Sequence, residues 1–204
     1  MTIGILALQG AFIEHQHILD SLEVKTILVR NTKDLDNIDG IILPGGESTA
    51  MGKLLRDFCM LEPLKKKIQN GLPVFGTCSG MILLAKKISQ SDVVHLGVSN
   101  IQVKRNAYGR QLGSFETMGE FKGIDRKVKM TFIRAPYVEE VLENENSKEV
   151  EILSIVGEHI TAIREKNILA VAFHPELTDD TAIHSYFLDM VKNTKSNSSF
   201  DKSK

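Results

Sequence analysis

The chain has 204 residues, of which 42% are hydrophobic and 25% are charged, and its formal net charge is -1. This composition is typical of one soluble globular domain with a sizeable core. The near-neutral charge gives no reason to expect nucleic acid or an anionic membrane as a partner. No apolar run approaches the roughly 20 residues of a membrane span.

The first half of the chain alternates strand-like and helix-like segments. Short apolar or β-branched runs predict strands at residues 3–8, 24–29, 41–43 and 74–76. Continuous apolar runs of this length are typical of strands buried on both faces. Helical spacing predicts helices at residues 11–22 and 61–68, and Ser48 is placed to N-cap another helix. The alternation predicts an α/β fold: a doubly wound, mostly parallel sheet with helices on both faces.

The second half of the chain has a different pattern. Residues 98–132 predict antiparallel strands and long loops at one edge of the sheet, and the acidic residues 139–151 predict an exposed loop. Three further strands are expected at residues 151–156, 160–164 and 168–173. A final helix, capped by Asp179 or Asp180, is expected to run to about Val191. We therefore expect one domain over residues 1–193 and a disordered Ser-, Asn- and Lys-rich tail over residues 194–204.

A sharp turn at residues 76–80, Gly-Thr-Cys-Ser-Gly, lies between two apolar runs. This strand–turn–helix context is typical of a nucleophile elbow, with Cys78 where hydrolases place serine. The flanking glycines permit the tight turn, and the start of a helix favours a thiolate. The alternative is a small buried thiol, which is a common fate of cysteine.

A histidine and a glutamate follow the predicted strand at residues 168–173. His174 and Glu176 should lie at the same carboxyl edge of the sheet as Cys78, which is the edge where open α/β sheets bind ligands. Glu176 is placed to orient the His174 ring, which completes a nucleophile–base–orienter set. Taken alone, His174 would be interpreted as a structural histidine.

Acyl chemistry also needs donors for an oxyanion. The backbone N–H of Ser79 is one candidate, and the loop at Gly45 and Gly46 is expected to supply another. The alternative for this Pro-Gly-Gly segment is a simple turn. We expect Cys59, which lies among apolar residues, to be part of the core. Cys78 and Cys59 are expected to be free thiols, which indicates a reducing, cytoplasmic location.

Six segments together resemble the triad-type, class I glutamine amidotransferases, and most closely the glutaminase subunits of pyridoxal 5'-phosphate synthase. The segments are residues 6–11 with Glu14 and His15, 43–49, 76–80, 105–116 in part, 132–136 and 173–180. The resemblance implies a class I amidotransferase-like, flavodoxin-like sheet with an antiparallel edge. The elbow and the His-Pro-Glu segment are shared by many amidotransferases, whereas residues 105–116 and 132–136 indicate this subfamily.

The resemblance implies a role for each matching residue. Cys78 is the nucleophile, His174 the base and Glu176 its partner, and the substrate is L-glutamine. The glutamine-binding residues are implied to be Gly46, Glu47, Ser48, Arg105, Ile133 and Arg134. Without the resemblance, Arg105 and Arg134 would be interpreted as solvated surface charges. Ser79 stands where many members of the family carry alanine, but it keeps the backbone N–H.

The resemblance also implies a partner, a separate (β/α)8-barrel synthase subunit that receives the ammonia. A docking face is expected near Gln9, Glu14, His15 and the loop at residues 45–48. The sequence carries no motif for a bound PLP, metal or nucleotide, so no cofactor is expected. Three alternatives remain: a glutaminase or γ-glutamyl hydrolase of another system, a non-catalytic regulatory module, and a cysteine-elbow chaperone or deglycase.

Overall fold

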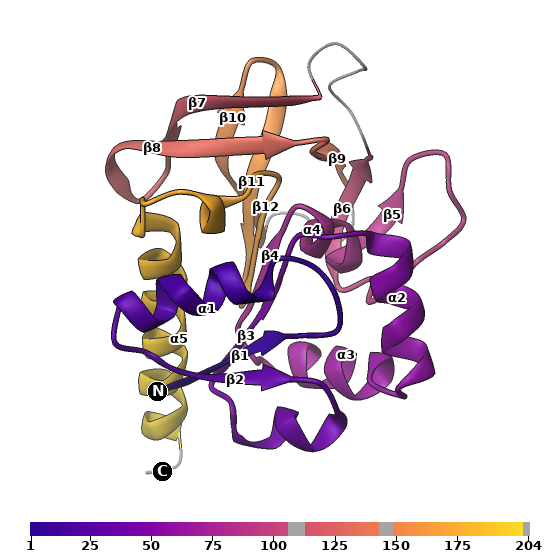
Figure 1. Ribbon diagram of the computed structural model, residues 1–204, viewed down its shortest axis with the longest axis vertical. Coiled ribbons are helices and arrows are strands. Elements are labelled where there is room, and N and C mark those ends of the chain that lie inside the picture. Colours follow the sequence, from indigo (N-terminus) through magenta and orange to yellow (C-terminus); the bar gives the residue numbers. More distant parts are fainter. Residues whose placement is uncertain (106–112, 143–148, 202–204) are drawn as a thin grey trace.

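The computed structural model describes residues 1–105, 113–142 and 149–201, the last five of these by backbone alone. Within these residues, ten strands form one sheet in the order β2-β1-β3-β4-β12-β11-β9-β6-β5, with β10 paired to β11. Helices cover both faces of this sheet (Figure 1). None of the described helices is long and apolar enough to span a membrane.

One half of the sheet is parallel and carries the predicted α/β pattern. Its strands are β2 (Lys25–Val29), β1 (Thr2–Leu6), β3 (Gly40–Leu43), β4 (Val74–Thr77) and β12 (Ile168–Val171). Every residue of β3, β4 and β12 is buried, because helices cover both faces. After β1 the chain adds β2 on one side of it, and β3, β4 and β12 then follow on its other side, so this half of the sheet is doubly wound.

The other half of the sheet is mainly antiparallel. Its strands are β11 (His159–Glu165), β9 (Tyr137–Val141), β6 (Ser99–Lys104), β5 (Ala85–Ile88) and β10 (Val150–Val156). Among these described strands, only β5 and β6 pair in parallel. The predicted antiparallel edge is therefore confirmed.

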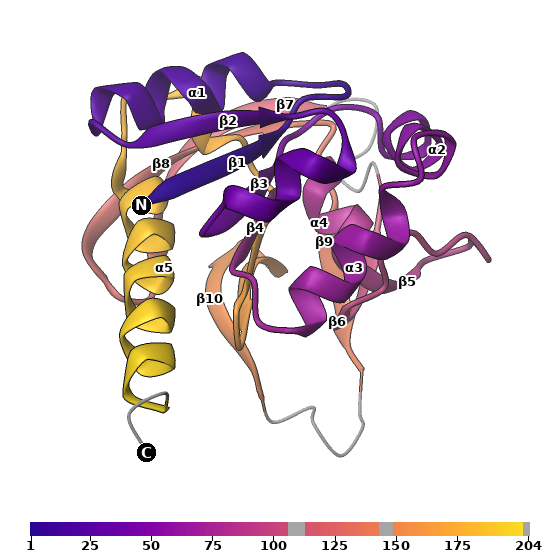
Figure 2. The ribbon, with the colours of Figure 1, turned by 90° about the horizontal axis from the view of Figure 1, so that it is seen from below.

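The helices lie in two groups, one on each side of the sheet (Figure 2). α1 (Phe12–Ser21) and α5 (Ala182–Asp201) cover one face, while α2 (Ser48–Asp57), α3 (Leu61–Gln69) and α4 (Ser79–Leu84) cover the other. Short 3-10 turns add η1 (Thr32–Asn37) and η3 (Pro175–Leu177). All six residues of α4 are buried, so the helix that follows Cys78 passes through the core.

Two predictions for the middle of the chain were wrong in part. β7 (Ser114–Phe121) and β8 (Ile124–Ile133) form a separate two-stranded sheet rather than an edge of the main sheet. The predicted exposed loop at 139–151 begins inside β9 and ends inside β10. Glu139 is acidic yet lies in a strand because its carboxylate binds Gln102 and Lys104 on the neighbouring strand β6. Residues 143–148 lie outside the described residues.

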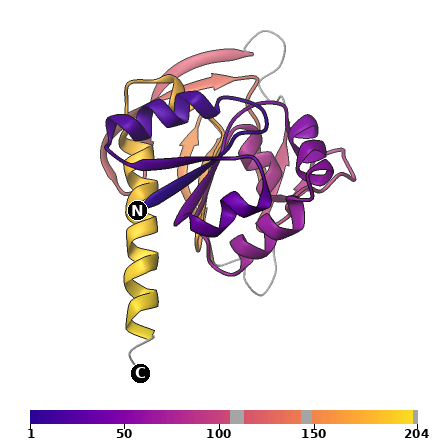
Figure 3. The same cartoon turned by 60° about the horizontal axis from the view of Figure 1, so that its bottom comes forward.

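The last helix is longer than predicted, since α5 continues to Asp201 rather than ending near Val191. Its second half extends beyond the sheet (Figure 3). The polar side chains that suggested a tail are satisfied locally: Thr194 Oγ1 donates to Met190 O and Ser196 Oγ donates to Lys192 O. Lys195 also pairs with Asp39 at 2.7 Å. At the other end, Asp180 Oδ1 accepts from the Ala182 N–H, as expected of a cap.

Candidate active site

Cys78 lies at the turn between β4 and α4, with φ 47° and ψ -101°. Non-glycine residues rarely adopt positive φ, and such strain is concentrated at functional sites. The glycines of the elbow are required by contacts. A Cβ on Gly76 would lie 2.7 Å from the Gly80 carbonyl carbon, and a Cβ on Gly80 would lie 2.1 Å from Leu43 O. The elbow therefore fits only because both positions lack a side chain.

His174 follows β12, the strand beside β4, so the two residues meet at the carboxyl edge of the parallel strands. The His174 backbone N–H donates to Thr131 O at 2.8 Å, which ties the residue to β8. Its Nδ1 lies 2.7 Å from Glu176 Oε1, and the Glu176 side chain is fully buried. The predicted pairing of the two side chains is present, with Glu176 behind the ring and away from the pocket.

The charged form of the His174 ring is favoured by its two neighbours. Burial disfavours the imidazolium, but hydrogen bonds with Cys78 and Glu176 outweigh it and raise the pKa of His174 to about 10. The ring is therefore charged at neutral pH, and a cation beside Cys78 stabilises a thiolate. The arrangement can support both nucleophilic attack and proton donation to a leaving group.

The loop at Gly45 and Gly46 lies directly against this pair. A Cβ on Gly45 would be 2.3 Å from His174 Cε1, so only glycine fits there. Gly45 O accepts from the Ala11 N–H at 2.9 Å, and the Ser79 hydroxyl donates to Gly46 O. Hydrogen bonds therefore fix both peptide groups that follow these glycines.

The predicted residues gather around one hollow of about 510 Å³. Its walls include Cys78, His174, Gly45, Gly46, Ser79, Glu47, Ser48, Arg105, Ile133 and Arg134. A larger hollow of about 640 Å³, between residues 120–127 and 152–155, has no cysteine or histidine in its described walls. Chemistry rather than volume therefore singles out the first hollow as the candidate site.

Several polar groups in this hollow are suited to a zwitterionic ligand. Arg105 lies 3.4 Å from Glu47, and both side chains reach solvent. Burial alone would raise the pKa of Glu47, but the Thr49 and Ala50 N–H groups and Arg105 hold it below the usual value. The Ser48 hydroxyl is buried and has no hydrogen-bond partner among the described residues. Arg134, with φ 42°, is a second strained residue in the wall.

Four details of the structure differ from the sequence prediction or were missed by it. Glu47 rather than Ser48 N-caps α2, because its longer side chain reaches the Thr49 and Ala50 N–H groups. Cys59 is exposed rather than part of the core. It lies in the turn after α2 with φ 55°, outside the helical spacing of its apolar neighbours.

His15 is fully buried, so it cannot belong to a docking face, although the neighbouring Glu14 is exposed. The signal for its burial is a spacing of three or four residues from the apolar Phe12, Ile18 and Leu19 of α1. Sequence reasoning also missed Gln9 as an anchor of the loop, since Gln9 Oε1 accepts from the Glu47 N–H at 2.9 Å.

Comparisons with known proteins agree with this geometry. The model of the SNO glutamine amidotransferase family matches residues 5–193. Pyridoxal 5'-phosphate synthase subunit PdxT of Streptococcus pneumoniae serotype 2 is 55% identical over 196 residues, covering 94% of this chain and 98% of the relative. PdxT of Streptococcus pneumoniae strain R6 gives the same identity and coverage.

Solved structures show the same fold. A crystal structure of a glutamine amidotransferase superposes with a TM-score of 0.86 at 40% identity, covering 93% of this chain and 98% of that one. PurLQS from Thermotoga maritima, at 15% identity and a TM-score of 0.64, shares the fold, and the match covers 96% of this chain and 97% of that one. The chain belongs to the SNO glutamine amidotransferase family.

Proposed function

We propose that this chain hydrolyses the side-chain amide of L-glutamine at Cys78 and supplies the ammonia to a pyridoxal 5'-phosphate synthase subunit. The observation that carries the proposal is the strained Cys78 beside the buried His174–Glu176 pair, in the wall of a hollow with charged groups of both signs. The family match and the relatives named PdxT support the same substrate and the same pathway.

The reaction divides into two acyl transfers. The Cys78 thiolate attacks the carboxamide carbon, and the backbone N–H of Ser79 and the loop at Gly45 and Gly46 stabilise the oxyanion. As the C–N bond breaks, His174 donates a proton to the departing ammonia and a γ-glutamyl thioester remains. His174 then takes a proton from water, which attacks the thioester and releases glutamate and the thiolate.

The walls of the hollow can distinguish glutamine from other amides. Arg105 and Arg134 would hold the α-carboxylate, and Glu47 would attract the α-ammonium. Ser48 would use its hydroxyl, which has no hydrogen-bond partner among the described residues, on the same end of the ligand. Ile133, which is 37% exposed, would contact the methylenes. These contacts act on substrate binding rather than on bond making.

The partner proposed for the ammonia is a synthase subunit, because the PdxT relatives are named as subunits of a synthase. The resemblance of the sequence to glutaminase subunits implies that this partner is a (β/α)8 barrel. Ammonia released into water at neutral pH is mostly protonated and loses its nucleophilicity. Direct transfer from this chain to the docked synthase subunit would avoid that loss. We place the protein in the cytoplasm, where a nucleophilic thiol stays reduced. The glutaminase of a different synthase is the second candidate, and copurification with the native synthase distinguishes the two.

The test is steady-state glutamate release by the purified chain in complex with its synthase. Cys78→Ala is expected to abolish glutamine hydrolysis, and His174→Asn should cost as much because the members of such a set act as a unit. Glu176→Gln should cost less, since it removes an orienting group. Thermal unfolding of each variant serves as the control for folding. Activity retained in Cys78→Ala would rule out this mechanism.

A further inference from the structure

A second polar layer lies behind the proposed triad, built from residues that the mechanism above does not use. His15 of α1 and His184 of α5 are both fully buried, and His15 Nδ1 lies 2.9 Å from His184 Nε2. His15 Nε2 lies 3.2 Å from Thr77 Oγ1 and 3.5 Å from Glu176 Oε2. Two histidines far apart in sequence thus connect with the carboxylate that holds His174.

The second oxygen of Glu176 shows why this layer matters. Oε1 is bound to His174, but Oε2 is buried and has no hydrogen-bond partner among the described residues. A buried carboxylate oxygen without a donor is costly, and catalytic contacts are often long before substrate binds. The ring nitrogen of His15, at 3.5 Å, faces that oxygen directly.

Both rings of the layer are neutral at neutral pH. Burial, followed by the nearby His184 and His174, holds the pKa of His15 well below its usual value. Burial lowers the pKa of His184 to about 3. Phe75 packs edge-on against both rings, with centroid distances of 6.1 and 5.7 Å, and adds to their apolar surroundings. Each ring therefore carries one proton, and its position can be argued from the contacts.

The contacts favour one arrangement of these protons. If His184 carries its proton on Nε2, it donates to His15 Nδ1, and the His15 proton lies on Nε2, facing Glu176 and Thr77. His184 Nδ1, which has no hydrogen-bond partner among the described residues, is then a bare acceptor. In the reverse arrangement His15 Nδ1 donates to His184 Nε2, so the His184 proton lies on Nδ1, where it is buried without an acceptor among the described residues. His15 Nε2 then turns a lone pair toward the Glu176 carboxylate, and both effects disfavour this arrangement.

We infer that His15, held in one tautomer by His184, presents its Nε2–H to Glu176 Oε2 and thereby positions this carboxylate for His174. The inference rests on the proposed triad and extends it by two positioning residues. Neither histidine touches the substrate. A donor on Oε2 fixes the rotation of the Glu176 carboxylate, so that Oε1 stays directed at His174 Nδ1.

The variants that test this role differ in whether they keep the donor. His15→Leu fills the same space without an N–H, whereas His15→Gln places an amide N–H2 near the position of Nε2. His184→Phe removes the partner that fixes the tautomer of His15. His17→Leu is the matched control, because His17 is an exposed histidine on the same helix.

The measurement is kcat and KM for glutamine hydrolysis by the complex with the synthase. His15→Leu is expected to lower kcat by roughly 10-fold to 100-fold, as is typical when an orienting group is lost, with KM close to wild type. His15→Gln should restore most of the rate, and His17→Leu should match wild type.

Several results would overturn the inference. One is wild-type kcat in His15→Leu. Another is an equal loss of kcat in His15→Leu and His15→Gln, which indicates a packing role only. If His15→Leu does not fold, His184→Phe decides, and wild-type kcat in that variant contradicts the inference. His174→Asn is measured in parallel: activity in that variant rejects the triad itself, whereas an inactive His174→Asn with a normal His15→Leu rejects only the role of His15.

Discussion

At the residue scale, the two functional motifs were predictable because each is local. Cys78 needs its flanking glycines and a helix after it, and Glu176 needs only to lie two residues beyond His174. The buried histidine layer was not predictable, because His15 and His184 are 169 residues apart and meet only when α1 and α5 pack together. Cys59 was wrongly assigned to the core because it lies in the turn after α2, where the helical spacing of its apolar neighbours no longer applies.

The charge on His174 makes a prediction about stability against pH. Its pKa is raised to about 10 in the folded chain, from about 6.5 in the unfolded chain. A raised pKa stabilises the folded state fully below pH 6.5 and loses this contribution as pH rises through 10. The stability of wild type relative to His174→Asn should therefore fall between about pH 6.5 and 10. Urea unfolding of both proteins at pH 6, 8 and 10 measures it, and a constant difference would show that the ring is not charged.

At the scale of elements, the parallel half of the sheet was predictable and the rest less so. Fully buried strands such as β3 and β12 have continuous apolar sequences, and these runs identify them. β7 alternates exposed and partly buried residues, which is the pattern expected whether this strand joins the main sheet or pairs only with β8, so the sequence could not place the two strands. The end of α5 was missed because its polar side chains bond to their own helix.

The elbow gives a prediction at this scale. Gly80→Ala would place a methyl group 2.1 Å from Leu43 O, which is backbone and cannot rotate away. We expect this variant to lose about 1–3 kcal/mol of stability through overpacking, and to lose glutaminase activity as the turn shifts. Thermal unfolding measures the first effect. Gly157→Ala is the comparison, since nothing lies within 4 Å of the added methyl and only its positive φ is strained. Equal, small losses in both variants would contradict the close packing.

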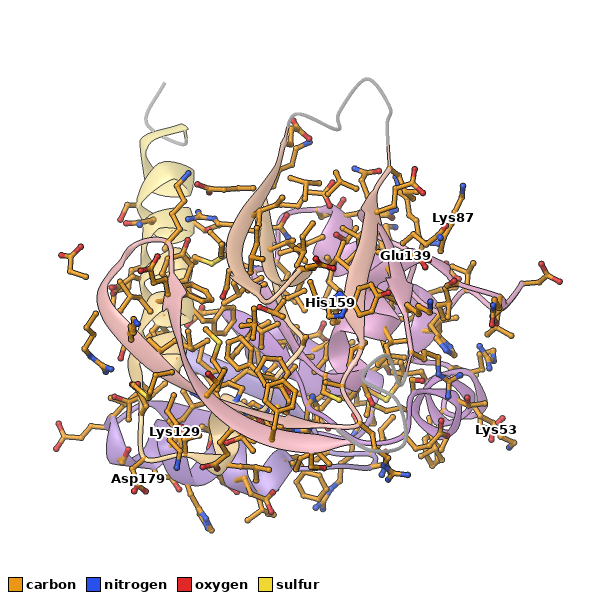
Figure 4. All side chains as sticks on the ribbon, turned by 90° about the horizontal axis from the view of Figure 1, so that it is seen from above. Lys53, Lys87, Lys129, Glu139, His159 and Asp179 are labelled. Carbon is orange, nitrogen blue, oxygen red and sulfur yellow. The ribbon has the colours of Figure 1, made fainter. Side chains whose placement is uncertain are left out.

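At the scale of the whole molecule, the site lies where the segment before α1, the loop at Gly45 and Gly46, and the end of β8 meet. Charged side chains of both signs are distributed around the surface, among them Lys53, Lys87, Lys129, Glu139 and Asp179 (Figure 4), in keeping with a net charge of -1. Net charge therefore does not select a partner. Local features near the site, such as the exposed Glu14, are the better guide to a docking face.

Partner-dependent activation is the prediction at this scale. Hydrogen bonds from Ala11 and Ser79 hold the peptides of the loop at Gly45 and Gly46. We expect a peptide group of this loop to have two orientations, only one of which directs its N–H at the oxyanion. Docking of the synthase beside the loop would shift the population toward that orientation. Glutamate release by the chain alone should be low and should rise on adding purified synthase. Full activity without the synthase would refute this, and unchanged synthase affinity in Glu14→Lys would exclude the proposed docking face.

The central claim is that Cys78 is the nucleophile for glutamine, and the two thiols of the chain allow a direct test within one molecule. Cys59 is exposed, whereas Cys78 is only 7% exposed. The synthase complex is treated with a diazoketone analogue of glutamine, and the modified peptide is identified by mass spectrometry. We predict an adduct on Cys78, prevented by excess glutamine, with Cys59 unmodified despite its exposure. Modification of Cys59 in preference to Cys78 would contradict the account.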